Sequence, residues 1–104
     1  MQFDVYENTD KDTKKVYPFF VDIQTNLLDS LNSRVVIPLT QTNNVSKEYP
    51  KNLCPNVSID SKNYALLSHQ ITSVPISLLK KKSISIESNR LDVVAAIDFL
   101  VTGI

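Results

Sequence analysis

The chain has 104 residues, of which 42 % are apolar and 21 % are charged, and this length suits one domain with one hydrophobic core. Eleven basic residues balance eleven acidic ones, and a zero net charge argues against a protein that binds DNA or RNA by itself. A single cysteine excludes a disulfide-rich secreted scaffold, and no apolar run approaches the roughly 20 residues of a membrane helix. The first residues lack the basic and apolar stretches of a signal peptide, so we expect one cytoplasmic domain over residues 1–104, without membrane contact.

Apolar and polar residues alternate with a period of two through much of residues 2–79, which predicts half-buried strands. The expected strands cover residues 2–6, 17–24, 35–39, 57–59, 64–67 and 72–79, with polar loops at residues 7–15 and 40–55. Asp60-Ser61-Lys62-Asn63 predicts a hairpin turn, and Pro38 suggests a sheet edge or a bulge. Lys80-Lys81-Lys82 is expected to end the last strand as a solvated segment. Because the chain has one glycine, Asn and Asp are expected at turn positions with a positive φ.

The last quarter of the chain changes to a helical period that begins near Leu91. Ser88 is the expected N-cap, and Gly103, the only glycine, lies where a left-handed C-terminal cap belongs. The expected core face consists of Val93, Val94, Ala96, Ile97, Leu100, Val101 and Ile104, and the opposite side carries Leu91, Ala95, Phe99 and Thr102. The pattern therefore predicts a mainly β fold, with six or seven antiparallel strands closed by one C-terminal helix.

No set of residues with the spacing of a catalytic or metal site is visible. Cys54 has no histidine next to it in the sequence and is expected to be a small buried apolar side chain. His69 lacks an orienting acid, and Cys54 with His69 is two ligands short of a structural zinc site. The remaining candidate carboxylates, Asp22, Asp29 and Asp60, are scattered rather than paired. We expect no catalytic residues, no metal and no cofactor.

Several short segments, in order along the whole chain, carry a family resemblance. They are Met1-Gln2-Phe3 with Val5-Tyr6, Phe20-Val21-Asp22 with Gln24, Val36-Ile37-Pro38-Leu39, Leu53 with Pro55, Val57 and Ile59, Ser73-Val74-Pro75 with Ser77, Ala96-Ile97, and Gly103-Ile104. In their order, spacing and shared length they resemble the CcdB toxins of bacterial toxin–antitoxin modules. The resemblance implies an SH3-like barrel variant, with a five-stranded antiparallel sheet, a smaller sheet and a C-terminal helix.

The resemblance also implies a function. CcdB toxins are homodimers that are not enzymes; they bind the A subunit of DNA gyrase and trap it in covalent complex with cleaved DNA. A CcdA antitoxin neutralises them with a disordered segment that folds on binding. Toxin and antitoxin together repress their own operon, with the antitoxin supplying the DNA-binding part.

Carried over by position, the gyrase-binding residues are Thr25, Leu27, Leu28, Asp98, Val101, Thr102, Gly103 and Ile104. The chain departs from the pattern at one of them. The best-known family member has a tryptophan immediately before the final Gly-Ile, where this chain has Thr102, and a hydroxyl cannot replace the stacking of an indole. An inactive or purely regulatory homologue is therefore one alternative.

A sequence-specific endoribonuclease is the other alternative, because a family of RNA-cleaving toxins shares the implied fold. Those enzymes carry an Arg-Gly-Asp stretch near the N-terminus and a catalytic arginine. This chain has no glycine before Gly103, and its two arginines are Arg34 and Arg90. Because a shared fold does not transfer activity, the gyrase-binding toxin remains the preferred interpretation.

Overall fold

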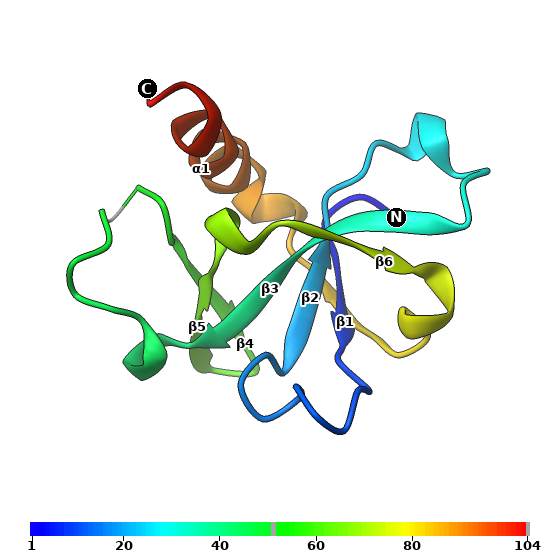
Figure 1. Ribbon diagram of the computed structural model, residues 1–104, viewed down its shortest axis with the longest axis horizontal. Coiled ribbons are helices and arrows are strands. Elements are labelled where there is room, and N and C mark those ends of the chain that lie inside the picture. The colour runs from blue at the N-terminus through cyan, green and yellow to red at the C-terminus, as the bar shows by residue number, and fades with distance from the viewer. Residues whose placement is uncertain (51, 104) are drawn as a thin grey trace.

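The computed structural model describes residues 1–50 and 52–103, which form seven short strands followed by one helix (Figure 1). In chain order these are β1 (Asp4–Glu7), β2 (Phe19–Asp22), β3 (Ser33–Gln41), β4 (Asn56–Ile59), β5 (Lys62–Leu66), β6 (Thr72–Pro75), β7 (Lys82–Ser85) and α1 (Arg90–Thr102). All strand pairs of the described residues are antiparallel. The predicted mainly β fold with a C-terminal helix is confirmed.

The long strand β3 organises the sheet, whose strand order is β4-β5-β3-β2-β1-β7. One long edge of β3 pairs with β2, and the other is shared by β6 along its first half and β5 along its last three residues. Because two strands divide one edge of β3, the sheet curls into a half-barrel, and α1 lies at one end of it (Figure 1). This architecture is consistent with an SH3-like barrel variant.

Pro38 lies in the central strand β3, which corrects the expectation of an edge or a bulge. It is opposite Phe20 of β2, and its carbonyl accepts the N–H of Leu67 on the other side. In a strand, the nitrogen and the carbonyl of one residue point to the same side, so the Pro38 nitrogen faces this second side. There the pairing with β6 ends at Val36 and the pairing with β5 starts at Leu39. A missing N–H at this gap removes no ladder hydrogen bond.

The hairpin predicted between β4 and β5 is confirmed. Asp60 and Ser61 have φ values of 51° and 66° and form a two-residue loop between the paired residues Ile59 and Lys62. The expectation that Asn and Asp fill the positive-φ positions holds for Asp60 alone among the described non-glycine residues, since the others are Ser61 and Phe3. Phe3 is buried, and its N–H donates to the carbonyl of Asp22, so tertiary contacts hold this backbone conformation.

Two strand predictions near the end of the sheet are wrong. The strand expected over residues 72–79 ends at Pro75, because its partner β3 begins at Ser33, opposite Pro75; a 3₁₀ turn, Ile76–Leu78, follows. Strand β7 was not expected after Lys80-Lys81-Lys82. It includes Lys82, pairs with β1 and packs only one apolar side chain, Ile84, against the core. An alternation of apolar and polar residues as short as this one does not distinguish a strand from a loop in the sequence.

The main core lies between the sheet and α1, and the helix face that reaches it is narrower than predicted. Val93 and Ala96 are buried and Ile97 packs against the core, but Val94, Leu100 and Val101 are exposed. Apolar residues occur all round this helix, so its period could not identify the buried side.

The two ends of α1 differ in how well the sequence predicted them. The N-cap is Asn89, without a side-chain capping bond, rather than Ser88, because residues 87–89 form a 3₁₀ turn that continues into α1. Gly103 has a φ of 76°, and its N–H donates to the carbonyl of Phe99. The predicted left-handed cap is therefore confirmed.

Candidate functional site

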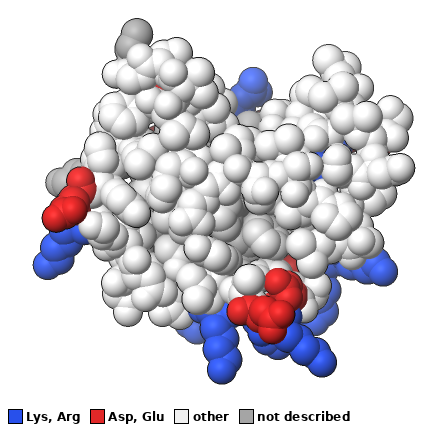
Figure 2. All heavy atoms as spheres, in the orientation of Figure 1, with Lys and Arg blue, Asp and Glu red and all other residues white. Residues whose placement is uncertain are grey.

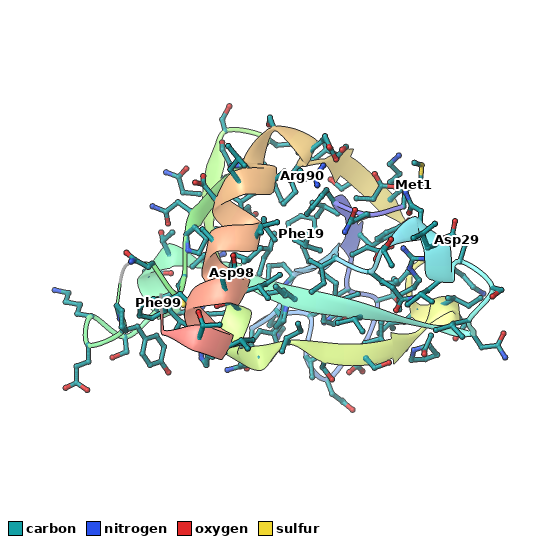
Figure 3. All side chains as sticks on the ribbon, turned by 90° about the horizontal axis from the view of Figure 1, so that it is seen from above. Met1, Phe19, Asp29, Arg90, Asp98 and Phe99 are labelled. Atoms are coloured by element: carbon teal, nitrogen blue, oxygen red, sulfur yellow. The ribbon has the colours of Figure 1, made fainter. Side chains whose placement is uncertain are left out.

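The predicted partner-binding residues fall into two groups at two ends of the protein. Thr25, Leu27 and Leu28 lie in the segment between β2 and β3, residues 25–32, which we term the leucine loop. Residues 98–103, termed the helix end, contain Asp98, Val101, Thr102 and Gly103, whereas Ile104 lies outside the described residues. The leucine loop, which contains Asp29, is far from Asp98 in both views (Figures 1 and 3). One chain alone does not bring the two groups together.

A capped turn holds the leucines outward. The 3₁₀ turn Asn26–Leu28 is capped by Thr25, whose side-chain oxygen accepts the N–H of Leu27 at 3.4 Å. The side chains that follow are large and apolar, yet Leu27 is 90 % exposed and Leu28 is 45 % exposed. Exposed apolar side chains in a structured turn are typical of a binding surface.

A buried ion cluster lies beneath the leucine loop. Arg34, on β3, is 6 % exposed, and Asp22, on β2, is 1 % exposed. The Arg34 Nε atom lies 3.0 Å from Asp22 Oδ2, Nη2 lies 3.1 Å from Asp22 Oδ1, and Nη1 donates to Asp29 of the loop. Burial disfavours the charged guanidinium, but its hydrogen bonds to the two carboxylates outweigh this effect and raise the pKa of Arg34. Asp22 and Asp29 therefore share one cation and do not form a paired-carboxylate site.

Gln24 links the two ends of the leucine loop. Its Nε2 atom lies 3.2 Å from the carbonyl of Leu28 and 3.4 Å from that of Ser33, and its Oε1 atom accepts the N–H of Val35 at 3.0 Å. One buried amide thus satisfies three backbone groups. These contacts close the loop, and the sequence analysis did not predict them because it treated each strand separately.

Tyr6 extends the cluster towards a shallow hollow of about 180 Å³ that is lined by Met1, Tyr6, Asp22, Asp29, Arg34, Ile76 and Leu79. Burial, with the nearby charges of Asp4 and Asp22, raises the pKa of the Tyr6 hydroxyl. The hydroxyl therefore stays protonated, and the floor of the hollow is a hydrogen-bonded structural network rather than a set of free reactive groups.

The helix end is open to solvent. Val101 is 75 % exposed, and a Cβ placed on Gly103 would meet no atom within 4 Å. The hydroxyl of Thr102 donates to the carbonyl of Asp98 at 2.7 Å, within the helix itself. The last turn thus exposes the apolar side chain of Val101 to solvent, as a recognition surface requires.

Cys54 and His69 lie together, although no histidine neighbours Cys54 in the sequence. The Cys54 Sγ atom is 3.9 Å from His69 Nδ1, and the Tyr49 ring packs edge-on against the imidazole at 4.9 Å. The hydroxyl of Ser68 donates to the carbonyl of Leu53 and so joins the two segments. Burial raises the pKa of the Cys54 thiol, which keeps it protonated and weakly nucleophilic. This cluster attaches the long loop to β5.

Both arginines make contacts within the chain. Arg34 is held by Asp22 and Asp29, and the guanidinium carbon of Arg90 lies 6.0 Å above the ring of Phe3. Over residues 1–50 and 52–103, no three His, Cys, Asp or Glu side chains gather where they could hold a metal. These contacts give the endoribonuclease alternative no support.

On one face of the protein, the surface around both groups carries little charge apart from that of Asp29 and Asp98. Figure 2 shows one face, on which charged side chains gather mainly along the lower edge, and the projections formed by α1 and the leucine loop are nearly free of them. Within the described part of the chain, no helix has the length and apolar character needed to cross a membrane. A weakly charged surface of this kind favours contacts with another protein over contacts with nucleic acid.

Comparison with known families agrees with this geometry. The family model described as CcdB protein matches residues 2–103. The match includes every strand, the leucine loop and α1. Because it extends over nearly the whole domain, the chain belongs to the CcdB family, and it is a toxin of a bacterial toxin–antitoxin module.

Proposed function

We propose that this toxin binds the A subunit of DNA gyrase and stabilises the covalent complex of gyrase with cleaved DNA, without being an enzyme itself. The observation that carries the proposal is the helix end, at the position where the family resemblance locates gyrase contacts. There Val101 is 75 % exposed and Gly103 has open space around it. A largely exposed apolar side chain such as Val101 can supply the buried anchor that a protein interface needs.

A homodimer would bring the two distant site groups into one surface. Along α1, Leu91, Val94 and Val101 are exposed apolar side chains, and such a strip on a small domain is typical of an interface. Two copies whose α1 C-terminal ends meet near a two-fold axis would join their helix ends into one platform. Each leucine loop would then be able to contact the same partner from the side.

Thr102 lowers the affinity that we expect for gyrase. Its hydroxyl is hydrogen-bonded to Asp98 within the helix, and it offers no ring for stacking. Affinity must then come from Val101, the final two residues and the leucine loop. This toxin is expected to bind gyrase more weakly than a member with an aromatic residue at the same place.

Neutralisation and repression follow the family pattern in this proposal. A CcdA-like antitoxin binds the toxin with a disordered segment that folds on contact. The complex of the two represses the operon, with the antitoxin contacting DNA. The zero net charge of the toxin supports this division, because a protein without a basic excess gains little from phosphate contacts.

A gyrase cleavage assay tests the proposal. Purified gyrase, plasmid DNA and ATP are incubated with the toxin, and linear DNA is measured after detergent and protease treatment; we expect it to accumulate. Val101→Asp should reduce this signal strongly, since loss of a buried anchor costs about 2 kcal/mol or more, roughly 30-fold in affinity. Val16→Asp is the matched control, because Val16 is also an exposed valine but lies in the loop after β1.

The other outcomes of this assay separate the alternatives. Equal loss of signal in both variants would show that the added charge, and not the helix end, is responsible. RNA cleavage by the wild-type toxin in a parallel reaction without gyrase would refute the proposal in favour of an endoribonuclease. A toxin that binds antitoxin but neither traps gyrase nor cleaves RNA would be a regulatory homologue.

A further inference from the structure

We propose that Asp29 is a positioning residue for partner binding, whose carboxylate acts through Arg34 to fix Leu27 and Leu28 in their exposed positions. The inference rests on the proposed function and adds a residue that need not touch the partner. Asp29 directly follows the turn Asn26–Leu28, and its side chain reaches back to Arg34 on β3. The ion pair thus joins the middle of the leucine loop to the sheet beneath it.

The buried part of the cluster does not depend on Asp29. Arg34 uses Nε and Nη2 for Asp22 and for the carbonyl of Gln24, and these contacts neutralise its charge and satisfy most of its donors. The Asp29 side chain is 61 % exposed and receives only Nη1. Because Asp29 is open to solvent and Arg34 keeps Asp22 as its buried partner, loss of the Asp29 contact should cost little global stability, and the contact is better explained by its effect on the loop.

The leucines themselves have few other restraints. Around Leu27 the turn is held by local hydrogen bonds of 3.1 to 3.4 Å, in which Thr25 and Asn26 accept the N–H groups of the next residues. The tertiary hydrogen bonds come from the N–H of Gln2, which donates to Asn26 Oδ1 at 3.1 Å, from Gln24 Nε2, which donates to the carbonyl of Leu28, and from the N–H of Ile76, which donates to the carbonyl of Asn32. Because Leu27 is 90 % exposed, its own packing cannot fix it. The side chain of Asp29 is the tether that follows directly after the turn.

Fixing an exposed apolar side chain before binding lowers the entropic cost of the complex. A protein interface loses affinity for each flexible side chain and loop that it must order. If Asp29 keeps the turn in its bound geometry, replacing Asp29 should add the entropic cost of ordering the loop to the free energy of binding. We expect Asp29→Ala to bind the gyrase A subunit about tenfold more weakly, with the melting temperature changed by no more than about 4 °C.

The binding experiment uses the full-length toxin and purified gyrase A subunit, with affinity measured by calorimetry. Asp12→Ala is the matched control, because Asp12 is an exposed acidic residue in the loop after β1, and it should bind like wild type. Asp29→Asn keeps a hydrogen-bond acceptor for Arg34 and should fall between wild type and Asp29→Ala. An Asp29→Ala variant with wild-type affinity would overturn the inference.

A mutant cycle shows whether Asp29 acts through the leucines. In a background that carries both Leu27→Ala and Leu28→Ala, Asp29→Ala should have little further effect on affinity, because the side chains that it positions are absent. In a Val101→Ala background it should still cost the full tenfold, since Val101 lies at the helix end. Equal losses in both backgrounds would show that Asp29 contacts the partner itself or acts elsewhere, and would refute a positioning role.

Hydrogen exchange tests the same inference without gyrase. Amides of residues 26–31 should exchange faster in Asp29→Ala than in wild type, while those of β3 stay unchanged. Unchanged exchange in the loop would contradict the positioning role even if gyrase binding were weaker. If the wild-type toxin does not bind the gyrase A subunit, the proposed function fails, and the exchange result still decides whether Asp29 orders the leucine loop.

Discussion

Replacing Arg34 by methionine should destabilise the protein strongly, because it leaves a carboxylate buried without its main partner. Asp22 is 1 % exposed and accepts three hydrogen bonds from the guanidinium of Arg34. After the change it keeps the N–H of Gln24 at 3.1 Å and the amino group of Met1 at 3.5 Å. Breaking a buried pair by removing one partner costs about 3–5 kcal/mol, a large part of the ~5–15 kcal/mol that stabilises a typical domain.

A second variant separates the buried charge from the loss of packing. Asp22→Asn combined with Arg34→Met removes both charges and keeps similar volumes, so it should lose clearly less stability than Arg34→Met alone, by about 1–3 kcal/mol. Urea unfolding followed by circular dichroism measures both values, since the chain has no tryptophan for fluorescence. A loss below about 1 kcal/mol for Arg34→Met, or a double variant as unstable as the single one, would refute the reasoning.

Four further predictions concern the helix end, the cysteine cluster and the dimer. A chain that ends at Thr102 loses the Gly103 N–H bond, worth about 1 kcal/mol, so it should fold and dimerise by sedimentation yet no longer inhibit growth. Thr102→Trp should bind gyrase at least as tightly as wild type in calorimetry, because an indole restores a stacking surface. Cys54→Ala and His69→Ala should keep growth inhibition, and the Cys54 thiol, with its raised pKa, should be alkylated slowly at neutral pH and faster as the pH rises. The wild-type toxin should sediment as a dimer at micromolar concentration, and a monomer would contradict the shared platform.

The architecture could be predicted because most elements have one buried side. The period of two in residues 17–24 and 35–39 corresponds to β2 and β3, and Gly103 marked the end of α1 because the left-handed cap conformation favours glycine. Prediction failed for elements that do not have one clearly apolar side. α1 is apolar all round, so its buried side is decided by contact with the sheet, and β7 has only one apolar residue, Ile84, within its four residues.

The contacts that build the leucine loop could not be predicted, because they depend on strand register. Asp22 and Arg34 are twelve residues apart and meet only once β2 pairs with β3. A charged residue inside an apolar alternation was the available signal for both. Cys54 and His69 meet for a similar reason, since the turn after β5 returns the chain to the long loop. Spacing in the sequence predicts which residues are neighbours within one helix or strand. It does not predict contacts between residues of two different elements.

The two site groups owe their exposure to different and independent causes. At the helix end, a left-handed glycine ends α1 beyond the edge of the core, so Val101 stays 75 % exposed. In the leucine loop, by contrast, an ion cluster buried in the sheet holds a turn in place, so Leu27 is exposed although the loop is well connected. Because no described contact joins the two, substitutions in one group should leave the geometry of the other unchanged. Their effects on partner affinity should therefore add, unless a second copy of the chain brings the loop of one protomer against the helix end of the other.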